Sequence, residues 1–269
     1  MNIGDIGKYI RHLRNKNKLT QSQLGVILSV SNKTVSKWES GFGLPEIETL
    51  LKISDYFNIT VDDLLRAKFI ENVHTEFLYI LDASGSMYGV SEDVIGGFNS
   101  FLDEQKVLPD QAYLTTVVFN HDVNTVYLSK DIKTVEYINR DTYRASGSTS
   151  LFDAIGSSVF SLQERSKTDK VMVIIMTDGY ENSSRIFTGS KIKKIIEEKS
   201  ELGWEFIFAG ANIDVDKVSD SIGIRKDRRM VYTSDKKGTR EIYNRMSKMT
   251  SSYRQTGDIK VEKKESNSN

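Results

Sequence analysis

Residues 76–86 are EFLYILDASGS, and their pattern predicts how the larger part of the chain folds. Apolar and aromatic residues run without interruption from 77 to 81, which is typical of a strand buried on both faces. The run ends at Asp82, and Ser84 and Ser86 follow at alternate positions. One carboxylate and two hydroxyls therefore emerge at the carboxyl end of a strand. Open α/β sheets bind their ligands at that edge.

The rest of the chain after residue 76 alternates between short apolar runs and amphipathic stretches. The further expected strands are residues 113–119, 171–176 and 204–209. The expected helices between the strands are residues 94–105, 150–163 and 190–199. Such alternation predicts an α/β domain with a doubly wound, mostly parallel sheet that helices cover on both faces.

Two more oxygen-rich motifs follow the first one. Residues 147–154, GSTSLFDA, contain Thr149, and the TDG at 177–179 places Asp178 directly after the apolar run VMVIIM. The candidate metal ligands are Asp82, Ser84, Ser86, Thr149 and Asp178, all of them hard oxygens. This chemistry favours Mg²⁺ or Mn²⁺ over zinc or copper. Asp153 lies in the second motif, but we expect it to cap or pack a helix instead.

These three motifs, in this order, resemble the metal-ion-dependent adhesion site of von Willebrand type A domains over about residues 74–255. The resemblance implies that the hydroxyls ligate the ion directly and that the carboxylates act directly or through water. It also implies an open coordination position that accepts an acidic residue from a protein partner. We therefore expect Mg²⁺ (or Mn²⁺) as cofactor and a protein partner that offers a carboxylate.

The first 65 residues have a different, helical period, and five short helices are expected there. Thr20 and Gln23 have the spacing of a capping box, in which each side chain bonds the other residue's backbone N–H. Ser31 is expected to cap the next helix. The apolar positions assigned to buried helix faces include Leu24, Ile27, Leu28, Ile47, Leu50, Leu51 and Phe57.

The segment LTQSQLGVILSVSNKTVSKWESG, residues 19–41, resembles the helix-turn-helix of lambda-repressor and Cro-like regulators. The resemblance implies that the helix over about residues 31–39 enters the major groove of double-stranded DNA. Candidate DNA contacts are Gln21, Ser31, Asn32, Lys33, Thr34 and Lys37. Asn can pair with adenine and Lys with guanine, while Val30, Val35 and Trp38 are expected in the core. Gly25 and Ser29 depart from the family, which usually has Ala and often Gly at these positions.

Charge is unevenly distributed, although the whole chain has a formal net charge of zero. Residues 1–68 contain ten Lys and Arg against seven Asp and Glu. Residues 6–38 contain seven basic residues and no acidic one. A basic face of this kind is expected of a surface that contacts phosphates, although a solvated helix face would have the same composition.

These patterns predict four segments: a helix-turn-helix domain at 1–67, a linker at 68–75, a type A-like domain at 76–256 and a disordered tail at 257–269. The chain has no cysteine, which fits a reducing compartment. It begins without a signal-peptide pattern and contains no apolar run long enough to cross a bilayer. We therefore expect a cytoplasmic protein that does not associate with membranes.

The expected function is a sequence-specific DNA-binding transcriptional regulator whose second domain binds a protein through Mg²⁺. The alternative is an adaptor that binds no DNA and docks a protein partner or an ATP-driven machine. A metal-dependent hydrolase would use Asp82 and Asp178, but the three histidines match no catalytic motif and no phosphate-binding loop exists. We expect no enzymatic activity. A homodimer stays open, because no heptad repeat indicates where it would form.

Overall fold

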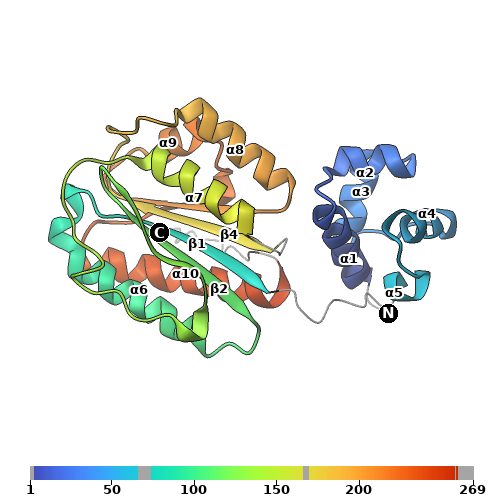
Figure 1. Ribbon diagram of the computed structural model, residues 1–269, viewed down its shortest axis with the longest axis horizontal. Coiled ribbons are helices and arrows are strands. Elements are labelled where there is room, and N and C mark those ends of the chain that lie inside the picture. Colours follow the sequence, from blue (N-terminus) through green and yellow to red (C-terminus); the bar gives the residue numbers. More distant parts are fainter. Residues whose placement is uncertain (1–2, 66–73, 166–169, 258, 260–269) are drawn as a thin grey trace, which may run out of the picture. The chain divides into compact units, whose positions relative to one another are not determined.

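The computed structural model describes residues 3–65, 74–165, 170–257 and 259, and it divides the chain into two compact units. The first unit contains α1 to α5, and the second contains the sheet, α6, α7, α8 up to Glu198, α9 and α10 (Figure 1). Nearly all of the expected linker and tail lie outside the described residues. The segment limits therefore stay predictions.

The first unit consists of five helices in its described part, as the sequence predicts. They are α1 (Ile3–Lys16), α2 (Gln21–Leu28), α3 (Asn32–Glu39), α4 (Ile47–Phe57) and α5 (Val61–Leu65). The expected capping box is present, since the Thr20 hydroxyl accepts from the Gln23 N–H and the Gln23 side chain accepts from the Thr20 N–H. The apolar core joins α1 to α5 through Ile6, Ile10, Leu13, Leu24, Leu28, Val35, Trp38, Leu50, Ile53 and Leu64.

Two positions of α4 and one of α2 are more exposed than the sequence pattern predicts. Ile47 is 77% exposed, Leu51 is 51% exposed and Ile27 is 36% exposed. Helix α4 has apolar residues on more than one side, so only one stripe can face the core. Leu50 and Ile53 form that stripe and are buried.

Both departures from the family pattern lie at the turn between α2 and α3. Ser29 ends α2 in the left-handed region, with φ 60° and ψ 39°, a conformation that glycine adopts at lower cost. Gly25 lies one turn earlier, where an ideal β-carbon would be 2.7 Å from the Val30 carbonyl oxygen. The missing side chain at 25 therefore lets the turn fold back closely onto α2.

A buried ion pair links α1 to α3. The Arg14 guanidinium donates twice to the Glu39 carboxylate, at 2.6 and 3.0 Å. The Gln21 side-chain amide donates to the same carboxylate at 2.9 Å. Since Glu39 accepts from three donors, α3 is held in a defined orientation relative to α1 and α2.

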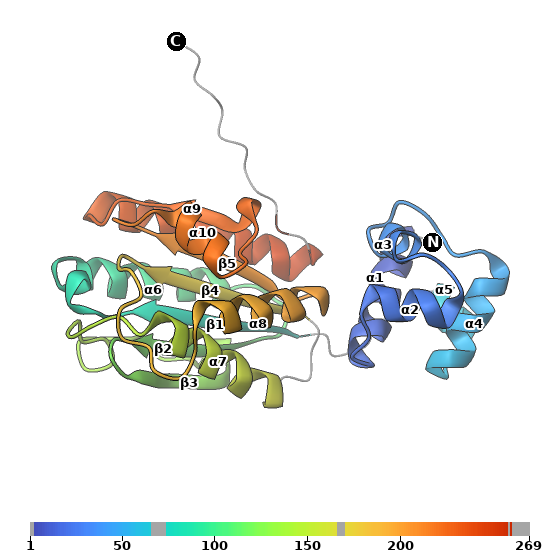
Figure 2. The same ribbon diagram turned by 90° about the horizontal axis from the view of Figure 1, so that it is seen from above.

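The second unit contains a six-stranded sheet with the order β3-β2-β1-β4-β5-β6, and the strand labels from β3 to β5 follow this order across Figure 2. The strands are β1 (Thr75–Asp82), β2 (Ala112–Phe119), β3 (Val123–Asp131), β4 (Val171–Thr177), β5 (Glu205–Gly210) and β6 (Arg229–Val231). All neighbouring pairs are parallel except β2 with β3. This confirms the predicted mostly parallel sheet.

Helices cover both faces of this sheet. They are α6 (Ser91–Lys106), α7 (Leu151–Arg165), α8 (Gly189–Glu201), α9 (Val215–Ser221) and α10 (Lys236–Thr256). Figure 1 shows α6 and α10 on one side of the sheet and α7 and α8 on the other. Every residue of β1 is buried, which explains its uninterrupted apolar run. Among the described helices, none is long and apolar enough to span a bilayer.

Candidate metal and DNA-binding sites

The candidate metal ligands come from neighbouring strands. Strands β1 and β4 pair in parallel, so Asp82 at the end of β1 and Asp178 just after β4 emerge at the same edge. Ser84 and Ser86 lie in the loop that follows β1, and their hydroxyl oxygens are 3.1 Å apart. The Ser86 hydroxyl donates to Asp178 Oδ1 at 2.5 Å. Four of the five expected ligands are therefore adjacent.

Gly179 shows where the fifth, Thr149, joins them. An ideal β-carbon at Gly179 would be 3.0 Å from Thr149 Oγ1, 3.7 Å from Ser86 Oγ and 3.8 Å from Asp82 Oδ2. Oxygens from three separate segments thus surround the open side of one glycine. The structure brings together all five residues that the sequence singles out, at a place that a side chain would fill.

The loop that carries Thr149 is fixed through its backbone. The Thr149 N–H donates to Asn182 Oδ1 at 2.8 Å, and the Asn182 N–H donates to the Thr149 carbonyl at 3.0 Å. The Gly85 N–H also donates to the Gly147 carbonyl at 3.0 Å. These bonds join the loops after β1 and β4 to the Thr149 loop. The Thr149 hydroxyl is therefore presented in a preorganised loop.

Two residues that sequence reasoning did not assign support Asp82. The Thr177 hydroxyl donates to Asp82 Oδ2 at 2.5 Å, and the Tyr143 hydroxyl donates to the Asp82 carbonyl at 2.5 Å. Thr177 belongs to the TDG motif, so its position was visible in the sequence. Tyr143 lies in an irregular segment, and no pattern in the sequence pointed to it.

The environment of Asp82 disfavours an isolated charge there. Asp82 is fully buried, and this burial raises the pKa of its carboxyl above the ordinary value. Hydrogen bonds from Thr177 and Ser84 act in the opposite direction, whereas the nearby Asp178 carboxylate raises the pKa further. A divalent cation between the two carboxylates would remove their repulsion.

The residues present fit a hard divalent cation. The set has two carboxylates and three hydroxyls, which suit an ion that prefers oxygen ligands and retains water where the protein provides none. Within the described ranges, no group of three His, Cys, Asp or Glu side chains is placed to hold a metal. Zinc and copper sites commonly rely on His or Cys.

Asp153 and Glu181 have structural roles beside this cluster. The Asp153 carboxylate accepts from the N–H groups of Arg185, Ile186 and Phe187. It therefore binds the loop after β4, where the sequence led us to expect that it caps or packs a helix. The Glu181 carboxylate accepts from the N–H groups of Phe152, Ser183 and Ser184. Both carboxylates hold the loop after β4 against the start of α7.

In the first unit, the candidate DNA-contacting residues lie around the start of α3. Ser31 caps this helix, since its hydroxyl accepts from the Thr34 N–H at 3.0 Å. Asn32, Lys33 and Lys37 are exposed on α3, and Thr34 is half-buried. Gln21 begins α2 and is oriented by its bond to Glu39. The exposed first turn of α3 therefore offers an amide and an ammonium group to solvent.

Comparison with known proteins identifies both units. Residues 78–245 match the family model of the von Willebrand factor type A domain, and the chain belongs to that family. Residues 10–64 match a helix-turn-helix family model. The chain is thus a helix-turn-helix domain followed by a von Willebrand type A domain.

Two curated transcriptional regulators are similar to a short part of this chain. The transcriptional activator BcrR of Enterococcus faecalis is 44% identical over 61 residues, which are 23% of this chain and 30% of that protein. The regulator ImmR of Bacillus subtilis is 33% identical over 60 residues, 22% of this chain and 47% of that protein. The chain therefore matches less than half the length of either relative.

Among solved structures, the pilus adhesin SpaC of Lactobacillus rhamnosus GG resembles the second unit. The match has a TM-score of 0.52 and 14% identity, and it covers 66% of this chain and 30% of that protein. At this identity the likeness concerns the fold alone.

Proposed function

We propose that this protein is a sequence-specific DNA-binding transcriptional regulator whose type A domain binds a protein partner in a Mg²⁺-dependent way. The proposed metal-dependent binding of a partner rests on one observation. Oxygens of Asp82, Ser86 and Thr149 converge on the open side of Gly179. The proposed DNA binding is supported by the match of residues 10–64 to the helix-turn-helix family model. It is also supported by the sequence identity to two transcriptional regulators.

In this proposal the metal is held by Asp82, Ser84, Ser86, Thr149 and Asp178. When bound, Mg²⁺ or Mn²⁺ would supply an open coordination position for an acidic side chain of the partner. Thr177 and Tyr143 position Asp82, and Asn182 positions Thr149. The chain performs no bond-breaking step in this account, so the type A domain acts as a binding module and not as an enzyme.

The DNA half assigns base reading to the first turn of α3. Asn32 and Lys33 are exposed there, and side chains of these two types recognise adenine and guanine in the major groove. Ser31, Thr34 and Lys37 would contribute further contacts around the helix. Gln21, oriented by Glu39, would contact a phosphate from the start of α2.

In vitro selection of duplexes from a random library by the full chain tests the DNA half. We expect enrichment of one sequence and an affinity that falls steeply with salt, because phosphate contacts release counterions. A two-fold symmetric sequence with half-sites about 34–36 Å apart would indicate a homodimer. No enrichment over random DNA would favour the alternative, an adaptor that binds proteins only.

A further inference from the structure

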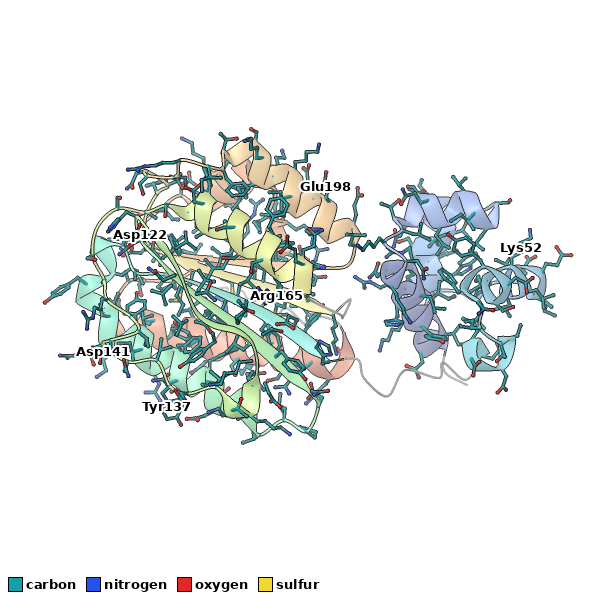
Figure 3. All side chains as sticks on the ribbon, viewed as in Figure 1. Lys52, Asp122, Tyr137, Asp141, Arg165 and Glu198 are labelled. Carbon is teal, nitrogen blue, oxygen red and sulfur yellow. The ribbon has the colours of Figure 1, made fainter. Side chains whose placement is uncertain are left out.

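A pocket lined mainly by polar residues lies beside the metal edge, between β3, α7 and the loop after β4. It has a volume of about 640 Å³. Val123 and Thr125 of β3 form one wall, and Ser157, Ser158 and Ser161 of α7 form the opposite wall. Figure 3 labels Asp122, just before β3, and Arg165, at the end of α7. Because the α7 wall consists of small serines, the space between strand and helix stays open.

The pocket has unsatisfied polar groups. Ser158 is 6% exposed, and its hydroxyl has no hydrogen-bond partner among the described residues. The buried hydroxyl of Ser183 on the opposite loop also has none there. The exposed guanidinium of Arg185 makes no ion pair with any described residue. Buried hydroxyls without partners are unfavourable. A polar ligand that bonds them would remove this cost. Asp122 and Asp153 also line the pocket, but the Asp153 carboxylate accepts from three backbone N–H groups and Asp122 Oδ2 lies 3.5 Å from His121 Nε2. Arg185 is therefore the lining side chain that can pair with an acidic ligand.

The strand beside the pocket is an open edge of the sheet. Strand β3 pairs with β2 on one side and with no other described strand. Its far half is irregular, with register shifts between Leu114 and Val117 of β2. Its near half, residues 123–125, pairs regularly and contains no Lys or Pro of the kind that protects edges from further pairing. The regular, unprotected part of the edge is therefore the part next to the pocket.

Residues that line the pocket adjoin the candidate metal ligands along the chain. Ser148 and Ser150 line it, and they flank the metal-ligand candidate Thr149. His121, another lining residue, packs so closely on Gly147 that a β-carbon there would be 2.3 Å from its Nδ1. Gly147 in turn accepts from Gly85 in the first metal-ligand loop. One bound segment can therefore reach both places.

We propose that an extended, acidic segment of the protein partner lies in this groove as an additional strand on residues 123–125. One acidic side chain of the segment reaches the metal, and another polar or acidic side chain occupies the serine-lined pocket near Arg185. Main-chain bonds to a sheet edge give affinity, while side-chain pockets give specificity. This inference rests on the proposed metal-dependent function and names the conformation and the second anchor of its partner.

The test uses a displayed library of linear peptides, each with one fixed Glu, selected on the full chain in Mg²⁺ and eluted with EDTA. A selected peptide is then synthesised with a single N-methyl group at each backbone position in turn. Strand addition predicts that alternate positions lose roughly tenfold in affinity, because only alternate N–H groups face the sheet edge. Ser161→Trp, which fills the groove, should weaken binding by a similar factor. Gln163→Trp, on the exposed side of the same helix, should not.

Three results would overturn the inference. In the first, peptide binding is lost in Asp82→Asn but is unaffected by Ser161→Trp and by every N-methyl group. This result would leave the metal-dependent function intact and would show that the peptide does not lie in the groove. Peptides that bind equally in EDTA would remove the link between groove and metal. A library without any Mg²⁺-dependent binder would also contradict a peptide groove. If Ser161→Trp fails to fold, the N-methyl series on the unaltered protein decides alone.

Discussion

Gly179 lies where the candidate metal ligands converge. The proposed metal site requires that residue 179 has no side chain. In Gly179→Ala the new methyl would be 3.0 Å from Thr149 Oγ1 and within 4 Å of Ser86 and Asp82 oxygens. Inserting a methyl into such a space costs about 1–3 kcal/mol. We expect Mg²⁺ affinity, measured by calorimetry, to fall by roughly ten- to a hundredfold.

Gly89→Ala is the matched control for this substitution. Gly89 lies in the same loop region as Ser86, but an added β-carbon there would meet no atom within 4 Å. Its Mg²⁺ affinity should equal that of the unaltered protein. If Gly179→Ala bound Mg²⁺ as tightly as Gly89→Ala does, the ion would have to bind elsewhere.

Glu76 is a second residue whose environment leads to a prediction. Glu76 is buried at the start of β1. Desolvation there raises the pKa of its carboxyl to about 7. The Ser129 hydroxyl donates to Oε2, His74 Nε2 is 3.9 Å from the same oxygen, and Oε1 has no described partner. The folded chain therefore holds this proton more tightly than the unfolded chain does.

The raised pKa of Glu76 makes the folded protein less stable as the pH rises. Between the ordinary carboxyl pKa of 4.5 and about 7 the unfolded state binds fewer protons, so stability decreases as the pH rises. The contribution of Glu76 is fully present below 4.5 and is lost as the pH rises through about 7. Glu76→Gln should flatten the dependence of the unfolding free energy on pH between these values. An unchanged pH profile in denaturant unfolding of this variant would contradict the assignment.

Among the helices, α3 contains the residues that we expect to contact DNA bases. Asn32→Ala and Lys33→Ala should each weaken binding to the selected sequence by about 1–3 kcal/mol, because each removes a base contact. Binding to random DNA should change much less for Asn32→Ala. Titrations with labelled duplexes of both kinds measure this difference.

Lys52→Ala is the control for α3, since Lys52 is an exposed lysine on α4. Its removal should leave specific binding nearly unaltered. Equal losses on specific and random DNA for Asn32→Ala and Lys33→Ala would assign both residues to phosphate contacts and would refute base reading by this helix.

The elements also show what sequence patterns can predict here. The buried strands β1, β2, β4 and β5 are predictable because strands covered on both faces are rich in apolar and β-branched residues. Strand β3 was missed, since an exposed edge with residues VNTVYLSKD has no such run. Strand β6 has only three residues. No helix is predicted over α10, although Ile242, Met246, Met249 and Tyr253 repeat at helical spacing.

The candidate metal site was predictable in its ligands but not in its supports. Asp82 and Asp178 stand in recognisable motifs at the ends of β1 and β4, so their convergence follows from the parallel pairing of these strands. Thr149 also stands in a recognisable motif, but it lies in an irregular segment just before α7. The contributions of Tyr143 and Asn182 depend on how irregular loops fold back, which residue spacing does not encode. The pocket depends on β3, whose position was not predicted.

At the scale of the whole molecule, we predict that residues 1–67 and 74–269 fold independently. Each unit has its own apolar core, and the hydrophobic period changes between them. The two fragments, expressed separately, should each unfold cooperatively on heating. A fragment with helical circular dichroism but no cooperative transition would show that the units share stabilising contacts.

Calorimetric titration of the full chain with Mg²⁺ and with Mn²⁺ measures the ion binding on which the proposed partner binding depends. We predict one bound ion, and at about 100 times its dissociation constant a stabilisation of roughly 2.7 kcal/mol. Thr149→Ala should weaken binding only in part, because water can replace a neutral ligand. Asp82→Asn should abolish binding, whereas Asp122→Asn, an exposed neighbour outside the ligand set, should leave it unchanged. Undiminished ion binding by a folded Asp82→Asn variant would contradict the metal site.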